Sequence, residues 1–203
     1  TGGRRGLRGT ERAAAVEYCR RALPTVSRSF ALTIPMVDPE IKDKITVGYL
    51  VARVLDTIED SPMPQEIKKM MMDEWLDAIS ADSSVSLESV MPKIKSIASK
   101  SSKYVADIAY AELMRNAFKV YTATTNFDRK FMACQHKWFM EMKDGMKKYL
   151  TKSITSFADF DEYTYYVAGT VGGFLTDLVC EGIEDETQRK ALKETFKDFG
   201  LLL

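Results

Sequence analysis

The chain has 203 residues, of which 45% are hydrophobic, enough to bury the core of one domain or of a large fragment of one. Lys and Arg together number 29, as do Asp and Glu, and the resulting zero net charge argues against nucleic acid as the main partner. No run approaches the roughly 18 apolar residues of a membrane-spanning helix. Three widely spaced cysteines without metal-ligand spacing indicate a reducing compartment. We therefore expect a protein that is cytoplasmic or associated with the cytoplasmic side of a membrane.

The apolar spacing is helical along nearly the whole chain and strand signals are scarce, so the predicted fold class is all-α. Residues 1–12 are rich in Gly and Arg and aperiodic, which predicts a flexible tail ahead of one domain over residues 13–203. Pro24 is expected to end the first helix. The predicted helices are Glu11–Leu23, Asp38–Asp60, Glu66–Ile79, Val90–Ala98, Lys103–Tyr121, Asp128–Tyr149 and Asp161–Glu181.

The end of the chain is unusually apolar. After Glu186, apolar residues recur at Leu192, Phe196 and Phe199, and Gly200 is followed by three leucines. A helix with this ending would expose hydrophobic side chains to water. We therefore expect the sequence to stop partway through its domain.

Five polar side chains share or flank one face of the second predicted helix: Tyr49, Arg53, Asp56, Glu59 and Asp60. Valine, leucine and isoleucine fill the remaining faces, so little of the helix is left for water. An unpaired buried charge is very costly, and one arginine cannot neutralise three acids. The missing positive charge is most simply a divalent cation, and oxygen-only ligands favour Mg²⁺.

A second interpretation is that these acids form the solvated end of an amphipathic helix. Ser61-Pro62-Met63-Pro64 follows directly, which places Asp60 near a helix terminus that water can reach. Ion-pair networks also gather acidic residues without any metal. The residues alone leave both interpretations open.

The segment from Tyr163 to Gly173 combines tyrosines with three glycines in five residues. Gly in a helix interior costs about 1 kcal/mol relative to Ala, so close helix packing or a functional site must account for these glycines. In the functional interpretation, Tyr163, Tyr166, Thr170 and Gly173 lie along one helical face. A tyrosine beside an apolar cavity offers a ring face to cations and a hydroxyl for proton transfer.

Three motifs occur in one order along the chain: Ser27-Arg28-Ser29-Phe30, then Asp56-x-x-Glu59-Asp60 preceded by Tyr49 and Arg53, then Tyr163-x-x-Tyr166-Val167-Ala168-Gly169. Together they resemble the squalene/phytoene synthase family, the head-to-head prenyl transferases. The resemblance runs from about Glu17 to the last residue. The Asp-Thr-Ile-Glu-Asp form of the second motif is more similar to squalene synthases than to phytoene synthases.

This resemblance implies an isoprenoid-synthase-type helical bundle around a central cavity that binds two farnesyl diphosphate molecules and Mg²⁺. The implied metal ligands are Asp56, Glu59 and Asp60. The implied catalytic residues are Tyr163, Tyr49, Asp56 and Asp60. The implied substrate-binding residues are Ser27, Arg28, Ser29, Phe30, Arg53, Tyr166, Val167 and Gly172.

The implied reaction is head-to-head condensation of two farnesyl diphosphates through a cyclopropyl diphosphate intermediate, followed by NADPH-dependent reduction to squalene. Peripheral contact with a membrane is expected for product release, and no nucleic-acid partner is expected. The family's second Asp-rich helix should begin just past Leu203, so its metal cluster and the NADPH site have no residues assigned here. Two alternatives remain: a synthase that makes phytoene or dehydrosqualene without NADPH, and a catalytically inactive helical scaffold.

Overall fold

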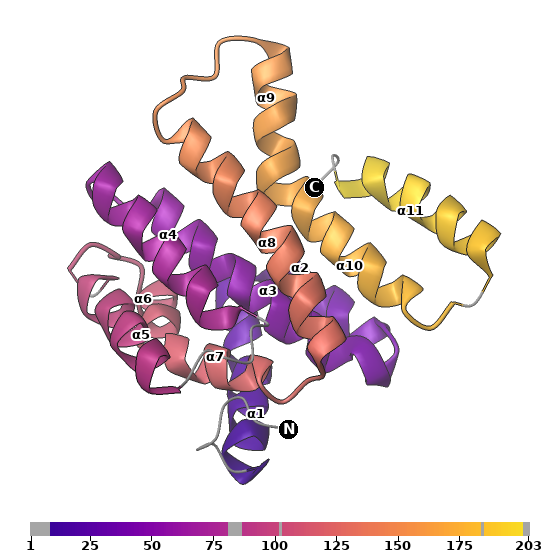
Figure 1. Cartoon of the computed structure of the whole chain (residues 1–203), viewed down its shortest axis with the longest axis horizontal. Coiled ribbons are helices and arrows are strands. Elements are labelled where there is room, and N and C mark those ends of the chain that lie inside the picture. The colour runs from indigo at the N-terminus through magenta and orange to yellow at the C-terminus, as the bar shows by residue number, and fades with distance from the viewer. Residues whose placement is uncertain (1–8, 81–86, 102, 184, 201–203) are drawn as a thin grey trace. The chain divides into compact units, whose positions relative to one another are not determined.

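The computed structural model describes residues 9–80, 87–101, 103–183 and 185–200, and of residues 196–200 it describes the backbone alone. All regular secondary structure in these ranges is helical (Figure 1), which confirms the all-α fold class. The chain divides into two compact units, residues 1–133 and 134–203. Within the described ranges, no helix is both long and apolar enough to cross a bilayer.

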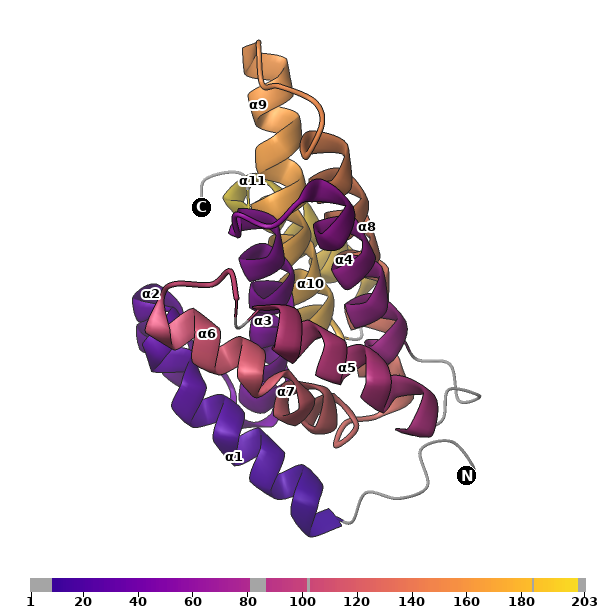
Figure 2. The same ribbon diagram turned by 90° about the vertical axis from the view of Figure 1, so that its left-hand side faces the viewer.

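The central element of the first unit is α3 (Pro39–Asp60), which contacts α1, α4, α6, α7 and the short 3-10 helix η1 of that unit (Figure 2). The other elements of this unit are α1 (Gly9–Val26), α2 (Arg28–Thr33), η1 (Ile34–Met36), α4 (Gln65–Ile79), α5 (Leu87–Ser101), α6 (Ile108–Arg115) and α7 (Ala117–Thr124). Helix α8 (Arg129–Tyr149) starts in this unit and continues into the second.

Local signals and burial agree along α3, and the structure confirms its predicted bounds. Asp38 is the N-cap, with its side chain accepting a hydrogen bond from the Glu40 amide at 2.8 Å, and Pro39 occupies the first helical position. From Ile45 onward nearly every residue is buried. Trp75 of α4, fully buried, donates its indole N–H to the Val51 carbonyl at 3.1 Å. Burial on this scale means that a charged side chain in the buried part of α3 must be paired or must serve a ligand.

Three helices predicted in the first unit differ from the structure. The helix expected over Val90–Ala98 is longer at both ends, since α5 runs over Leu87–Ser101. Helix α1 begins at Gly9, inside the expected tail, and runs through Pro24 to Val26, because buried Leu23 and Val26 hold its last turn against the core. The helix expected over residues 103–121 is two helices that meet at Asn116. The Asn116 side chain donates to the Glu112 carbonyl at 2.9 Å and to its carboxylate at 2.6 Å, so it competes with the helical backbone pattern.

The second unit consists of α8 from residue 134 onward together with α9 (Phe157–Thr164), η2 (Tyr165–Gly169), α10 (Thr170–Cys180) and α11 (Glu186–Gly200). Its core contains Phe139 of α8 against Phe174 of α10, two fully buried rings with centroids 5.1 Å apart. Lys193 of α11 forms an ion pair with Asp177 of α10 at 2.9 Å. These contacts tie three of the helices together.

A single helix was predicted over residues 161–181, but the structure has an α-helix, one turn of π-helix and a second α-helix. In the π-turn, η2, the Thr170 amide donates to the Tyr165 carbonyl, five residues earlier. The extra residue in this turn shifts everything after it around the helix axis. The π-turn therefore interrupts the regular period behind the face predicted for Tyr163, Tyr166, Thr170 and Gly173. Tyr163, Tyr166 and Gly173 nevertheless all pack against residues of α8.

Candidate functional site

The polar stripe of α3 forms a connected group of side chains. The Arg53 guanidinium donates one hydrogen bond to the Tyr49 hydroxyl and another to the Asp56 carboxylate. Tyr49 is only 5% exposed, whereas the side chains of Arg53 and Asp56 are 26% and 24% exposed. The i, i+4, i+7 spacing thus places these three groups together, at the edge of a buried helix.

The attraction between Arg53 and Asp56 does not fully offset the cost of burying the Asp56 carboxylate. Burial raises the pKa of Asp56, and the negative charge of Asp60 raises it further. The Arg53 guanidinium lowers this pKa, but not enough to cancel the other two effects, so the pKa remains above its ordinary value. Burial lowers the pKa of Arg53, but Asp56 and the Tyr49 hydroxyl more than offset that effect, so the pKa is raised. The carboxylate form of Asp56 therefore costs free energy in the folded protein, and an added cation would lower that cost.

The other two acids of the motif lie at the end of α3. Asp60 is its last residue and is exposed, and Glu59 is half-buried. The Glu59 carbonyl accepts a hydrogen bond from Lys68 of α4 at 2.5 Å, which fixes the end of the helix. Among the described residues, no three His, Cys, Asp or Glu side chains are placed to hold a metal ion by themselves. Mg²⁺ nevertheless fits this donor set, because it usually binds through one or two carboxylates together with phosphate oxygens and water.

Arg53 has an unused donor that bears on this fit. Its Nε is buried, and among the described residues it has no hydrogen-bond partner. A buried donor without a partner costs free energy. A phosphate oxygen beside the guanidinium would satisfy it, so the residues present suit a cation bound together with an anionic ligand.

The first motif, Ser27 to Phe30, lies at the start of α2. Ser27 is the N-cap of this helix and accepts a hydrogen bond from the Phe30 amide at 3.2 Å. The Phe30 ring contacts the Tyr49 ring, with centroids 4.3 Å apart. Arg28 and Ser29 are exposed. The structure thus brings Phe30 to the α3 group and assigns Ser27 a capping role.

One aromatic residue near this group was not predicted from the sequence. The ring of Tyr110 on α6 lies 5.9 Å from the Arg53 guanidinium carbon. Asp107 caps α6 by accepting from the Ala109 and Tyr110 amides, which sets the position of the ring. No spacing in the sequence connects Tyr110 to Arg53, because the two residues meet only through tertiary packing.

In the second unit, Tyr163 lies on α9 and is half-buried. Its ring meets the ring of Tyr149, at the end of α8, edge to face with centroids 5.2 Å apart. The Tyr149 hydroxyl lies 2.6 Å from the Glu162 carboxylate and 2.9 Å from the Asp159 carbonyl. The ring of Tyr163 is therefore positioned by a neighbour that is itself fixed.

Tyr166, in the π-turn, packs against a glycine of α8. A Cβ atom added at Gly145 would lie 1.9 Å from the Tyr166 ring carbon Cγ, so no larger residue fits there without displacing Tyr166. Val167 is half-buried and Gly172 is buried. Gly145 was not singled out in the sequence, because a lone glycine in a helical pattern does not reveal its partner.

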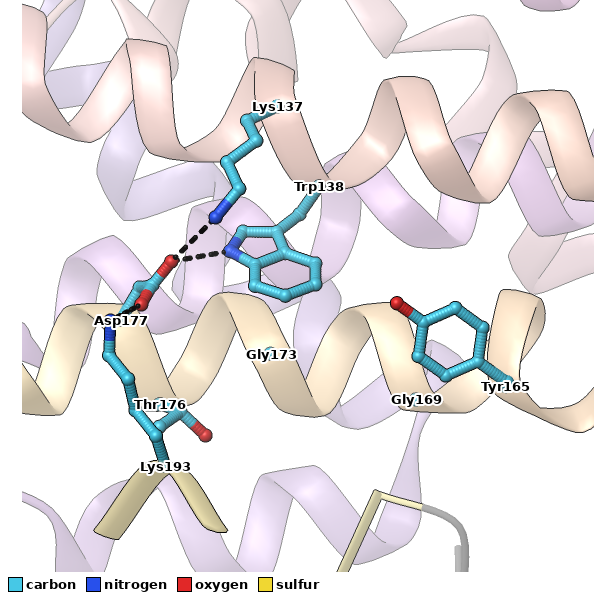
Figure 3. Close-up of a pocket in the computed structure, with 8 residues that line it drawn as sticks. All are labelled: Lys137, Trp138, Tyr165, Gly169, Gly173, Thr176, Asp177 and Lys193. Carbon is cyan, nitrogen blue, oxygen red and sulfur yellow. Dashed lines mark hydrogen bonds and ion pairs between the residues drawn. The ribbon is translucent and has the colours of Figure 1, made fainter. Parts of the chain in front are cut away.

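Close packing also explains Gly173, as the alternative interpretation expected. Figure 3 shows the Trp138 indole beside Gly173, where an added Cβ would lie 2.4 Å from the ring. The pocket around them measures about 300 Å³. Asp177 accepts from the Trp138 indole N–H at 2.8 Å and lies within 3.3 Å of Lys137, besides its ion pair with Lys193. The charged groups of this pocket satisfy one another, which indicates a structural role.

The helical fold and the polar stripe of α3 define a protein of the isoprenoid-synthase type, and comparison with known proteins agrees. The sequence profile described as squalene/phytoene synthase matches residues 23–203. The chain belongs to the squalene/phytoene synthase family.

Similar proteins include two curated squalene synthases. That of Dictyostelium discoideum is 30% identical over 195 residues, which cover 92% of this chain and 42% of the relative. That of Solanum lycopersicum is 31% identical over 170 residues, covering 83% and 37% respectively. The solved structure of TcSQS with the ligand BPH1237 matches with a TM-score of 0.73 and 27% identity, over 93% of this chain and 51% of that chain. The chain thus spans about half the length of these relatives, or less.

We predict that Gly145→Ala destabilises the protein by about 1–3 kcal/mol, the usual cost of overpacking, although alanine is the better helix former. The new methyl group cannot avoid Cγ of Tyr166, which lies close to the backbone. Urea unfolding measures the change. Gly182→Ala is the matched control, since nothing lies within 4 Å of its added Cβ. Equal stability of the two variants would contradict the packing assigned to Tyr166.

The raised pKa of Asp56 predicts a pH-dependent effect of Asp56→Asn. A carboxyl whose pKa is higher in the folded state contributes stability below its unfolded pKa of about 3.9 and loses it as pH rises through the folded value. Asparagine does not titrate, so the unfolding free energy of the variant relative to wild type should increase between about pH 4 and pH 7. Urea unfolding at both pH values tests this. A relative stability that falls as pH rises would show that Arg53 over-compensates the buried carboxylate.

Proposed function

We propose that this chain takes part in a Mg²⁺-dependent prenyl transfer, the head-to-head condensation of two farnesyl diphosphate molecules to squalene. The observation that carries this proposal is the Tyr49–Arg53–Asp56 group on a buried helix of a squalene/phytoene synthase family member. Its carboxylate has a raised pKa and its guanidinium has an unused donor, which suit a cation and an anion bound together.

The acids of α3 act as cation ligands in this proposal. Asp56 and Asp60 would hold Mg²⁺ and Glu59 would support them, with diphosphate oxygens completing the coordination. When bound, Mg²⁺ neutralises the diphosphate and so helps it to leave. Arg53 and Arg28 would pair with the remaining oxygens, and Arg28 is exposed and able to reach a ligand. The exposure of Asp60 likewise leaves it accessible.

The remaining residues would shape the cavity that receives the prenyl chains. The rings of Tyr49 and Phe30 contact each other and would form one wall beside the diphosphate. Tyr166, Val167 and Gly172 would line an apolar region that keeps water from the allylic cation. Ser27 and Ser29 would orient the start of α2 toward the same site.

Tyr163 is proposed to assist the proton loss that closes the cyclopropyl intermediate. Its hydroxyl supplies a group that can accept and pass on a proton, and its ring is held against Tyr149. The subsequent reduction with NADPH is proposed because the curated relatives cited above are squalene synthases. Product analysis with and without NADPH separates squalene from phytoene or dehydrosqualene.

Diphosphate binding tests the role of the α3 acids. We predict that inorganic diphosphate binds this chain only when Mg²⁺ is present, and that Asp56→Asn or Asp60→Asn weakens binding at least about tenfold, since each removes a charged ligand. Titration calorimetry measures the affinity, and circular dichroism should show unchanged helix content. Exposed Asp144, on α8, provides the control variant Asp144→Asn, which should bind normally. Unchanged affinity in both α3 variants would refute the assignment, and binding independent of Mg²⁺ would refute the proposed metal.

Tyr163→Phe tests proton transfer, because it removes the hydroxyl and keeps the ring against Tyr149. We predict a fall of roughly 10²–10⁴-fold in the single-turnover rate of farnesyl diphosphate with little change in stability. If the ring alone stabilises a cation, Tyr163→Phe should keep the rate and Tyr163→Leu should lose it. Tyr149→Phe is the control: it removes a structural hydroxyl and should lower stability more than rate. If both Tyr163 variants keep the wild-type rate, Tyr163 only packs against its neighbours and the catalytic assignment is wrong.

A further inference from the structure

The loop between α8 and α9 and the first turn of α9 present three apolar side chains to solvent. Phe157 is 90% exposed, Phe160 is 54% exposed and Ile154 is 45% exposed. Phe157 and Phe160 are three residues apart on α9 and therefore share a face, and Ile154 precedes them in the loop. Figure 1 shows this loop at the end of the hairpin that α8 and α9 form. We call these three residues the apolar tip.

The exposure of the apolar tip is built into a well-ordered turn. The Ser156 hydroxyl caps α9 by accepting from the Asp159 amide at 3.1 Å, and the Asp159 carboxylate accepts from the Ser156 hydroxyl at 2.8 Å. The same carboxylate accepts from the Thr155 amide and hydroxyl at 3.2 and 3.0 Å. This reciprocal network fixes the backbone around Phe157, so its outward direction is a consequence of the fold.

Ion pairs behind the apolar tip stiffen the hairpin further. Lys152 lies 2.5 Å from the Asp159 carboxylate and 3.3 Å from that of Glu162. Lys148 lies 2.5 Å from Glu162, and Tyr149 shares the same acid. The apolar side chains are thus held in place beyond a ring of polar groups. Such an arrangement is typical of segments that enter the interfacial region of a bilayer.

The apolar tip is poorly suited to binding another protein. Its three side chains offer on the order of 400 Å² of apolar area, about half of the roughly 800 Å² that each partner contributes to a stable interface. The tip is the end of a hairpin. A bilayer needs no complementary shape, because lipid chains adapt to whatever enters them. The small area and the position therefore favour a lipid surface.

The charge near the tip identifies the kind of lipid surface. Between residues 147 and 162 there are three lysines and three acidic residues, which balance. Attraction to anionic lipid would require an excess of Lys or Arg, which this segment lacks. The apolar side chains must then supply the driving force, and a zwitterionic bilayer is sufficient.

We propose that the α8–α9 hairpin inserts its apolar tip, Ile154, Phe157 and Phe160, into the interface of a zwitterionic lipid bilayer. Insertion requires no catalysis, so it holds or fails independently of the reaction proposed above. The proposal names the residues that would make the membrane contact expected from the sequence.

Flotation of this chain with phosphatidylcholine vesicles tests the proposal. Wild type should float with the vesicles, and the double variant Phe157→Ser, Phe160→Ser should lose at least about tenfold in partitioning, since two large apolar side chains no longer leave water. The control is Ile108→Ser in α6, whose side chain is 83% exposed and lies in the other unit. It should bind as wild type does. Adding phosphatidylserine should change little.

A second measurement places the tip in the lipid. Phe157→Trp fluorescence should be quenched by vesicles of brominated phosphatidylcholine well beyond the quenching of Trp75 and Trp138 in wild type. Three results would overturn the proposal: absence of flotation in wild type, equal flotation of the double variant, or equal loss with Ile108→Ser. Analytical sedimentation, which measures the oligomeric state, tests the alternative that the tip binds a second copy of the chain. If the double variant changes only the oligomeric state and leaves flotation intact, the tip binds a second copy of the chain.

Discussion

The pairing of Arg53 with Tyr49 and Asp56, on a helix buried along most of its length, is the interaction on which this protein's site depends. Charged groups in such a place reduce stability unless they are neutralised, and here the neutralisation is incomplete, because the pKa of Asp56 remains raised. A helix selected for stability alone would carry apolar residues at these positions. This incomplete neutralisation is the reason for our proposal that the cluster is a ligand site, whose electrostatic cost is recovered when a cation and an anion bind.

The sequence predicted the first unit's central helix well, because several independent signals coincide there. The Asp38 cap, the proline after it and a continuous helical period all indicate the same bounds. The spacing of Tyr49, Arg53 and Asp56 is local to one helix, so their proximity follows from helical geometry. Tyr110 belongs to the same group but comes from another helix, and only tertiary packing brings it near Arg53.

The sequence predicted the second unit less well. A regular period of 3.6 residues cannot reveal the π-turn at Tyr165–Gly169, which shifts the following residues around the axis. The sequence also did not reveal which side chain each glycine packs against. Gly173 leaves room for the Trp138 ring, and Gly145 on another helix leaves room for Tyr166. Each of these two glycines is thus explained by one neighbouring ring. The number of glycines in the segment does not by itself show whether they serve packing or catalysis.

Proton release on ligand binding tests the central claim most directly. If a bound cation lies against Asp56, it must lower the raised pKa of that carboxyl, so binding of Mg²⁺ and inorganic diphosphate near pH 5 should release protons from the protein. Calorimetry in buffers of different ionisation enthalpy counts them. The account predicts more protons released by wild type than by Asp56→Asn under identical conditions. Equal proton release by the two proteins, with binding intact, would contradict it.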